Sequence, residues 1–460
     1  MTAQQEAVRL LLEARERRAQ RQALLLEEGG TLVCLTMNIP GLPKISALIG
    51  RAFLEGARWI DRQFSRFGQE VKNRQLFALP TGDEGYWLTD APAGQVKRWM
   101  VEVEEFCGLG RLLDIDVLDR TGGISRQSLG LPARRCLICG GDARLCARGQ
   151  LHPMKLLRQR TETIIRDHFA AQRADEIAAL CCKSMLYEVS VTPKPGLVDR
   201  RDNGAHRDMD FFTFLDSASV LAMQFRRLYR LGRIHSGRAP AQLFSLLRFP
   251  GLLAEDAMYA ATGRVNTHKG LIFSLGILCA AIGWHDEKEE RPDFDQLLAF
   301  CGRMVSPVLS QELASAHPST GGERLFAETG RGGIRQEACA GYPTVRTVGL
   351  PALRRFLAQG YNSNDAGVYT LLAILAAAED SNIYARRGET VRQQVKQAAA
   401  RLLDTSALPS FERLDRWNQA FSEAGISPGG SADLLALCYF GYFYEQGRTL
   451  HERENSPPAS

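Results

Sequence analysis

The pattern of apolar residues changes once along these 460 residues, and this change most constrains the fold. From Thr31 to about Gln127, short β-favouring runs such as Thr31 to Met37 and Trp99 to Phe106 alternate with turn signals. From about Asp175 onward, long stretches rich in Ala and Leu, separated by loops with Gly and Pro, predict helices. The sequence therefore predicts a multidomain chain, with an N-terminal α/β or α+β domain followed by a mostly α-helical domain.

One segment joins the two parts. Met154 to Gln172 is rich in Arg, Gln and Leu and has no helix breaker after Pro153, so it predicts a connecting helix rather than a flexible linker. We place the boundary near residue 168, which gives domains of residues 1–168 and 169–460.

Charge and hydropathy exclude several classes of protein. The 57 Lys and Arg against 52 Asp and Glu leave a net charge of +5, too small to indicate a polyanion partner. The longest apolar stretches, around Leu271 to Trp284 and Leu434 to Tyr444, are shorter than the ~20 residues that span a bilayer, and predict buried helices. The charged N-terminus is not typical of a signal peptide, and eleven irregularly spaced cysteines indicate reduced thiols. We expect a cytoplasmic protein with no nucleic-acid and no membrane partner.

Two aspartates form the first chemical motif. Asp114 and Asp116 are two residues apart in a β-like run, and residues i and i+2 share one face of a strand. Two such carboxylates suit Mg²⁺, which binds one or two carboxylates together with substrate phosphate oxygens. Arg111 and Lys44 offer positive charge for a phosphate. The alternative is a pair of solvated aspartates on an ordinary strand.

Three cysteines and a histidine form the second motif. Cys136 and Cys139 make a C-x₂-C knuckle, followed by Cys146 and His152. Four such ligands suit a tetrahedral zinc site, while the alternative is a trio of cysteines packed under a loop. The basic residues around the motif admit a zinc-dependent nucleic-acid-binding module, but the stretch has no aromatic residue to stack on a base.

The helical part contains polar loops beside apolar segments. Lys194 lies between two prolines, which stiffen the loop, and it precedes a dense polar run: Asp199, Asn203, His206, Asp208 and Asp210. Asn266, Thr267, His268 and Lys269 lead into the apolar segment from Leu271, where a helix N-terminus favours anions. Glu379 to Ile383 follows an apolar helix, and Ser427 to Leu435 begins one, with Ser431 or its neighbour as the expected cap. Any single loop fits capping chemistry, but together they predict a cleft for a polyphosphate with Mg²⁺.

These motifs resemble two enzyme families in succession. NIPGLPK, GRLLDIDVLD and RRCLICGGDARLCARGQLH, between about Thr31 and His152, resemble apo-citrate lyase phosphoribosyl-dephospho-CoA transferases, also called holo-citrate lyase synthases. EVSVTPKPGLVDRRDNGAHRDMD, ATGRVNTHKGLIFSLG, GERLFAETGRGGIRQEA and SPGGSADLLA, between about Ala178 and Phe443, resemble triphosphoribosyl-dephospho-CoA synthases. The whole chain resembles the fused, bifunctional form.

The resemblance implies two consecutive reactions. The C-terminal domain would join ATP to 3′-dephospho-CoA with loss of adenine, giving 2′-(5″-triphosphoribosyl)-3′-dephospho-CoA. The N-terminal domain, nucleotidyltransferase-like in fold, would transfer the phosphoribosyl-dephospho-CoA group to a serine of the apo-acyl carrier protein, the γ subunit of citrate lyase, with release of pyrophosphate. The rival class is a zinc-dependent binding or scaffolding protein with a helical interaction domain.

Within this hypothesis the polar residues take three roles. The expected catalytic residues are Asp114, Asp116, Asp199, His206, Asp208 and His268, with either histidine moving the proton. The expected substrate-binding residues are Lys44, Arg111, Lys194, Asn203, Asn266, Lys269, Asn382 and Ser431. The expected Mg²⁺ ligands are Asp114, Asp116, Asp208, Asp210 and Asp380, with Asp433 as a weaker candidate, while Cys136, Cys139, Cys146 and His152 suit Zn²⁺.

Overall fold

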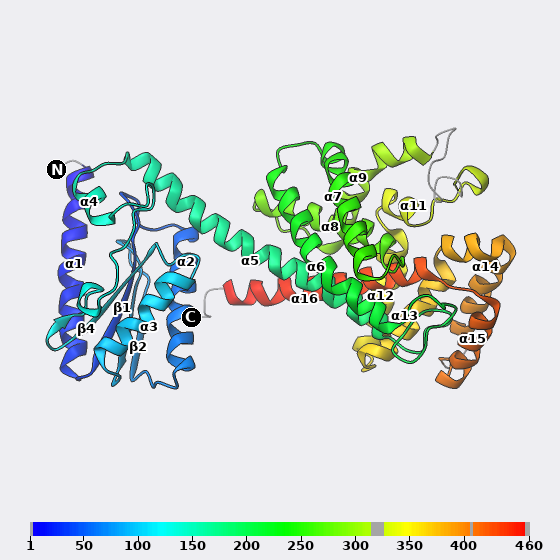
Figure 1. The fold of residues 1–460 in the computed structure, drawn as a ribbon, viewed down its shortest axis with the longest axis horizontal. Helices are drawn as coiled ribbons and strands as arrows, with labels where there is room; N and C mark the ends of the chain where they lie inside the picture. Colours follow the sequence, from blue (N-terminus) through cyan, green and yellow to red (C-terminus); the bar gives the residue numbers. More distant parts are fainter. Residues whose placement is uncertain (1–2, 314–325, 405–407, 456–460) are drawn as a thin grey trace. The chain divides into compact units, whose positions relative to one another are not determined.

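The computed structural model describes residues 3–313, 326–404 and 408–455 of the chain (Figure 1). These residues form two compact units, Met1–Gln172 and Arg173–Ser460. The first four residues of the GERLFAETGRGGIRQEA motif, 322–325, lie outside the described part.

A five-stranded antiparallel sheet forms the centre of the first unit. Its strands are β1 (Thr31–Met37), β2 (Asn73–Phe77), β3 (Glu84–Thr89), β4 (Leu113–Asp119) and the short β5 (Gly122–Gly123), in the spatial order β2-β3-β1-β4-β5. β1 pairs with both β3 and β4, so the predicted strand Thr31–Met37 is confirmed and is the middle strand. The unit is therefore α+β.

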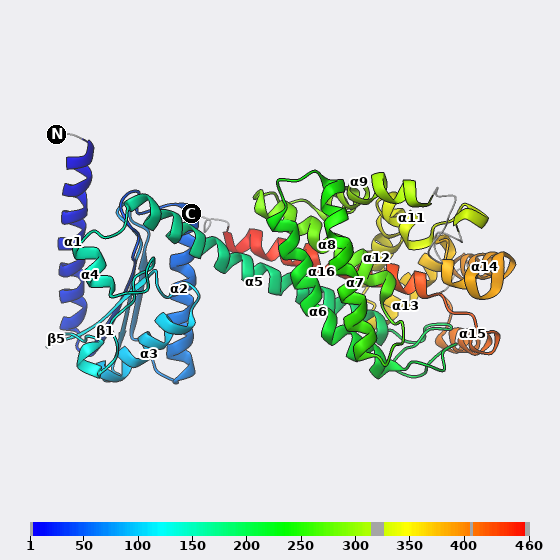
Figure 2. The same ribbon diagram turned by 45° about the horizontal axis from the view of Figure 1, so that its top comes forward.

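Helices cover both faces of this sheet (Figure 2). α1 (Ala3–Glu27) lies on one face, over Leu32 and Cys34. α2 (Ala47–Arg66) and α3 (Ala93–Phe106) lie on the other, against Val33 and Leu35. The alternation of side chains along β1 thus supplies two apolar layers.

The interpretation of Trp99 to Phe106 as a β-favouring run is wrong, because these residues end helix α3. Val96, Trp99, Met100 and Val103 are all buried, and their spacing of three and four residues fits one face of a helix. β-branched and aromatic residues raise strand propensity, but burial of this helical stripe against the sheet decides the conformation.

The predicted connecting helix is confirmed and extends further than the expected segment. α5 (Met154–Ser190) contains 37 residues, of which the first part belongs to the first unit and the remainder to the second. The segment between β5 and α5 contains two short helices, η1 (Gln127–Leu129) and α4 (Ala143–Arg148).

The second unit is helical throughout its described residues. After α5 come α6 (Phe211–Ile234), α7 (Pro240–Ala261), α8 (Lys269–Glu287), α9 (Phe294–Leu313), α11 (Gly333–Cys339), the π-helix η2 (Val345–Gly349), α12 (Leu350–Ala358), α13 (Ser363–Ala377), α14 (Ser381–Leu403), α15 (Phe411–Ala424) and α16 (Gly429–Asn455). Both predicted apolar segments lie within buried helices, α8 and α16. No helix among the described residues has the length and hydropathy that a membrane crossing requires.

α8 lies at the centre of the helical core, and glycine lets α6 approach it closely. A Cβ atom added at Gly232 of α6 would lie 2.0 Å from the carbonyl oxygen of Ala280, and one at Gly283 of α8 would lie 2.1 Å from that of Tyr229. Main-chain atoms cannot move aside as a flexible side chain can. The two glycines therefore allow the close approach of α6 and α8.

We expect Gly232→Ala to lower the stability of the helical unit by about 1–3 kcal/mol or more, because the added methyl group overpacks the α6–α8 contact. Urea unfolding followed by circular dichroism measures this change. Gly237→Ala is the matched control, because no atom lies within 4 Å of a Cβ at that position. Equal stability of the two variants would contradict the role given to Gly232.

Candidate active sites

Asp114 and Asp116 lie on one face of β4, as their spacing predicts. The intervening Ile115 is buried in the apolar layer under α2 and α3, whereas both aspartate side chains are open to solvent. In the sheet, Asp114 lies opposite Thr36 and Asp116 opposite Cys34. The pair is therefore accessible to a ligand that approaches this face.

The electrostatics of the pair favour a cation. Although solvent reaches Asp116, partial desolvation by the surrounding protein, followed by repulsion from Asp114, raises the pKa of Asp116, and Lys97 and Arg134 offset this rise only in part. A raised carboxyl pKa means that a negative charge is disfavoured there unless a positive ion comes in. Two carboxylate oxygens on one face are the donors that Mg²⁺ prefers.

Arg134 is a basic residue in direct contact with the pair. One terminal nitrogen of its guanidinium lies 3.2 Å from Asp114 Oδ1, and the other nitrogens donate to the carboxylate of Glu104 on α3. Arg111 belongs to the same charged cluster. Burial and then repulsion from Arg134 lower the pKa of Arg111. Arg134 was not among the expected site residues, since nothing in its sequence position beside Cys136 predicts a contact with β4.

Lys44 lies in the loop between β1 and α2, in a different electrostatic setting. Its ammonium donates to the carbonyl oxygen of Ile39. Burial and then repulsion from Arg15 and Arg158 lower the pKa of Lys44. An anion bound here would relieve this concentration of positive charge.

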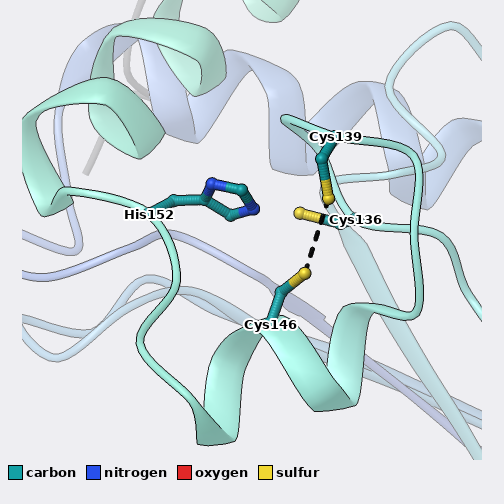
Figure 3. Close-up of side chains that lie close together, drawn as sticks. All are labelled: Cys136, Cys139, Cys146 and His152. Carbon is teal, nitrogen blue, oxygen red and sulfur yellow. Dashed lines mark hydrogen bonds between the residues drawn. The ribbon is translucent and has the colours of Figure 1, made fainter.

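The cysteine motif folds into a tight cluster, which we call the clip (Cys136, Cys139, Cys146 and His152). Figure 3 shows the three sulfur atoms gathered together, with the imidazole of His152 directed at them. One ligand atom from each of the four residues lies within 4.8 Å of the others, and the sulfur atoms of Cys139 and Cys146 are 3.5 Å apart. His152 Nε2 is buried and has no hydrogen-bond partner. This set of one imidazole and three thiols matches the donors of a closed tetrahedral zinc site.

Local hydrogen bonds shape the clip. Gly140 takes a positive φ of 72° in the knuckle, and the Asp142 carboxylate caps α4 by accepting from the backbone N–H groups of Arg144 and Leu145. All eleven cysteines of the chain are free thiols. The clip is therefore a cluster of reduced sulfur ligands, with no disulfide among them.

In the second unit, Lys194 is buried rather than open to solvent. Its side chain is 1% exposed, and its ammonium pairs with the carboxylate of Glu188 at the end of α5. Burial raises the pKa of Glu188, and Lys194 opposes this rise. The prediction of Lys194 as a phosphate ligand did not include this partner, although Glu188 stands only six residues before it.

The neighbouring aspartates organise the loop between α5 and α6. Asp199 is buried and accepts hydrogen bonds from the backbone N–H groups of Lys194, Arg201 and Asp202. Asp210 caps α6 through Thr213. Asn203 and Asp208 are exposed on the same loop.

Three helix N-termini converge beside the Glu188–Lys194 pair. Asp380 caps α14, and its other oxygen accepts from the backbone N–H and the hydroxyl of Ser431 in α16, at 2.7 and 2.8 Å. A Cβ added at Gly270, at the start of α8, would lie 2.1 Å from Asp433 of α16. Ser431 lies inside the first turn of α16, which begins at Gly429, so Ser431 itself is not the cap of this helix. Converging N-termini of long helices create a favourable site for phosphate groups.

Asp433 carries the most perturbed carboxyl of this centre. Burial raises the pKa of Asp433 well above its ordinary value, and the nearby carboxylates of Glu188 and Asp380 raise it further. Burial likewise raises the pKa of Asp380, although hydrogen bonds from Ser431 oppose this. We call Glu188, Lys194, Asp380 and Asp433 the acidic centre. Three carboxyl groups close enough to interact, one of them paired with Lys194, form a site that can hold a cation or keep one carboxyl protonated.

The two histidines have different surroundings. His268 precedes α8 and is fully enclosed: its Nδ1 lies 2.7 Å from Ser217 Oγ, and its Nε2 has no partner. Burial and then Lys194 lower the pKa of His268 to about 3, so it is neutral at physiological pH. His206 Nε2 lies 2.7 Å from Ser427 Oγ, and its Nδ1 is 3.8 Å from exposed Asp208. Burial and then Arg386 lower the pKa of His206.

The remaining expected residues lie around this centre with local roles. Lys269 is half exposed and forms a 2.8 Å ion pair with Glu255, while Asn266 accepts a hydrogen bond from the backbone of Lys269. Asn382 is in the first turn of α14, where its side chain lies against Gly429.

Comparison with family models assigns both parts of the chain. Residues 6–168 match the model of the apo-citrate lyase phosphoribosyl-dephospho-CoA transferase, CitX. Residues 174–451 match the model of the ATP:dephospho-CoA triphosphoribosyl transferase, CitG.

Curated relatives show the same order of domains. Protein CitXG of Haemophilus influenzae is 34% identical over 447 residues, which cover 94% of each chain. Protein CitXG of Leuconostoc mesenteroides subsp. cremoris is 33% identical over 457 residues, covering 94% of this chain and 95% of the relative. A probable 2-(5″-triphosphoribosyl)-3′-dephosphocoenzyme-A synthase of Streptococcus mutans is 38% identical over 291 residues, 60% of this chain and 98% of the relative.

Each of the two units contains its own group of charged side chains, and each matches one transferase family. Together these findings define a bifunctional transferase. The chain belongs to the CitXG family, in which CitX and CitG domains are fused, and it acts in the synthesis of the citrate lyase prosthetic group. This confirms the fusion expected from the sequence motifs. The rival class, a zinc-dependent nucleic-acid-binding or scaffolding protein, gains no support from the comparisons.

The buried His268 predicts a pH dependence of stability. In the unfolded chain, His268 takes up a proton as the pH falls below its ordinary pKa of 6.5. In the folded unit, His268 takes up this proton only near its lowered pKa of about 3. The contribution of neutral His268 is therefore complete above pH 6.5 and decreases as the pH falls, by ~1.4 kcal/mol per pH unit. His268→Gln should remove this slope. Urea unfolding of both proteins between about pH 4 and 7 measures the difference, and parallel stability curves would contradict the burial of a neutral imidazole.

Proposed function

We propose that residues 1–168 attach the prosthetic group to the acyl carrier protein and that residues 169–460 build its precursor from ATP and 3′-dephospho-CoA. The observation that supports this division is that each unit contains its own centre: the Asp114–Asp116 pair in the first, and the acidic centre at three helix N-termini in the second. The partner and the substrates follow from the two families, whose names contain citrate lyase, ATP and dephospho-CoA.

In the second unit we assign the ends of α8, α14 and α16 to the triphosphate of ATP, with Lys269, Asn266, Asn203, Asn382 and Ser431 around it. The carboxylates of Asp208, Asp210 and Asp380 are the candidates to hold Mg²⁺, which when bound would neutralise phosphate charge. The 2′-hydroxyl of dephospho-CoA forms a bond to the anomeric carbon of the ATP ribose as the bond to adenine breaks.

This reaction passes through a cationic, oxocarbenium-like state, which carboxylates stabilise. We assign Glu188 and Asp199 to electrostatic support of that state. Asp433, whose raised pKa keeps a proton available, donates that proton to the departing adenine. His206 accepts the proton of the attacking hydroxyl, because it is less enclosed than His268 and its pKa is less strongly lowered. Buried Lys194 and His268 hold the surrounding groups in place.

In the first unit the serine hydroxyl of the carrier protein attacks the α-phosphorus of the triphosphoribosyl group, and the bond to pyrophosphate breaks. We assign Asp114 and Asp116 to bind Mg²⁺, whose charge would offset that of the triphosphate. Arg111 and Lys44 neutralise the departing pyrophosphate. The fold of this unit, with an acid pair on one strand of an antiparallel sheet, supports the nucleotidyltransferase-like description.

For the clip we propose Zn²⁺ in a closed, structural site. Four protein ligands leave no position for substrate. We also place the enzyme in the cytoplasm, because its eleven free thiols suit a reducing compartment.

Asp114→Asn and Asp116→Asn should each reduce carrier modification by about 100-fold or more, because an amide cannot supply the charge that the reaction requires. Adenine release from ATP and dephospho-CoA should be unchanged, which serves as an internal test of folding. Mass spectrometry of the carrier protein and chromatography of adenine measure the two reactions. Asp119→Asn is the matched control, since Asp119 ends the same strand and bonds to Thr121. Normal carrier modification by both site variants would exclude the assignment.

Asp433→Asn should reduce adenine release by about 100-fold while changing the stability little, because the amide resembles the protonated carboxyl in shape and charge. Transfer of ready-made triphosphoribosyl-dephospho-CoA to the carrier should be unaffected. Asp415→Asn, on the surface of α15, is the control. If Asp433→Asn released adenine at the normal rate, Asp433 would not be the acid.

A further inference from the structure

Arg134 connects the clip to the Asp114–Asp116 pair, which we call the acid pair. The backbone carbonyl of Arg134 accepts a hydrogen bond of 3.0 Å from Ala143, and the next residue, Arg135, forms a β-bridge with Asp142. The backbone N–H of Cys136, which follows Arg135, donates to the carbonyl of Gly141 at 2.6 Å. The turn that presents the cysteines therefore also fixes the main chain of Arg134.

The other end of Arg134 is fixed by charge. Its guanidinium binds Glu104, which is only 6% exposed and which also forms a 2.7 Å ion pair with Arg126. From this position one guanidinium nitrogen reaches Asp114 at 3.2 Å. A planar guanidinium bound at two carboxylates has a defined orientation, so it also orients the Asp114 carboxylate.

The clip has little apolar core with which to hold this geometry. α4 contains six residues, and Leu145 and Leu151 are 66% and 64% exposed. The buried Nε2 of His152 without a partner, together with the three clustered sulfur atoms, points to a bound ion as the element that closes the turn. Loss of that ion would release Arg134 from the main-chain side.

We propose that the metal-loaded clip is a positioning element for the acid pair: it fixes Arg134, and Arg134 sets the orientation of Asp114. The inference rests on the proposed roles of the clip and of Asp114, and it goes beyond them by joining the two sites. Arg134 is a positioning residue, because it acts on the Mg²⁺–triphosphate complex through Asp114. Substitution of a residue that hydrogen-bonds to a metal ligand typically lowers the metal affinity by about 10- to 100-fold.

The test compares Arg134→Gln, Cys139→Ser and the double variant in the full-length protein. Three quantities are measured: zinc per chain by elemental analysis, the Mg²⁺ concentration that half-saturates carrier modification, and the rate of adenine release. Reversible removal of zinc from the wild type by a chelator provides the same comparison without a substitution. Arg144→Gln is the matched control, because Arg144 lies on the clip helix with an exposed side chain.

We expect the wild type to bind one zinc ion per chain and Cys139→Ser to bind none. Arg134→Gln and Cys139→Ser should each raise the half-saturating Mg²⁺ concentration about 10-fold, and the double variant should resemble either single variant, because both remove the same connection. Adenine release should stay normal, and zinc returned to the chelated protein should restore Mg²⁺ affinity.

Two results would overturn the inference. One is a double variant whose effects multiply to about 100-fold, because the clip and Arg134 would then act independently. The other is a zinc-free protein with the Mg²⁺ dependence of the wild type. A wild-type protein that neither releases adenine nor modifies the carrier would instead contradict the proposed function, so the two failures are distinguishable.

Discussion

The helical unit depends on the cost of burying charge at its centre. A lysine and a glutamate removed from water lose several kcal/mol of hydration each, and only close pairing with further hydrogen bonds offsets this. Lys194 and Glu188 meet this requirement at the end of α5, and Asp199 fixes the backbone of Lys194. The loop between α5 and α6 also contacts the segment before α16, through the hydrogen bond between His206 and Ser427. Any substitution that removes one partner of the Lys194–Glu188 pair leaves the other charge buried alone.

The two units present carboxylates in opposite ways. Asp114 and Asp116 are reached by solvent on β4, on the sheet face that also carries α1. Asp433 is partly buried among helix ends, where a developing positive charge is stabilised more strongly than in bulk solvent. The difference suits the two reactions: one delivers a group to a protein surface, and the other breaks a glycosidic bond that water would otherwise attack.

Local sequence rules predicted the elements better than their partners. The i, i+2 spacing was sufficient to place Asp114 and Asp116 together, and the apolar run from Leu271 was sufficient to predict a buried helix. The prediction of a β-favouring run at Trp99 to Phe106 was wrong. The side chains there favour a strand by type, but their spacing places the apolar ones on one face of a helix, and packing of that face against the sheet decides the conformation. Ser431 or its neighbour was expected to cap α16, but the Ser431 hydroxyl instead donates to Asp380, 51 residues earlier in the chain. Glu188 and Arg134 were missed, because their partners are defined by packing and not by a motif.

The sequence by itself determined the two-part organisation, the strand that carries the acid pair, the four residues of the clip and the bifunctional family. These features are encoded in periodicity and in short motifs, which need no knowledge of distant contacts. Only the tertiary structure decided that Lys194 is enclosed with Glu188, that His268 is neutral, and that Arg134 connects the clip to Asp114. The physical reason is that pKa and ion pairing depend on burial and on charges brought together across long stretches of chain, and neither quantity exists until the core has formed.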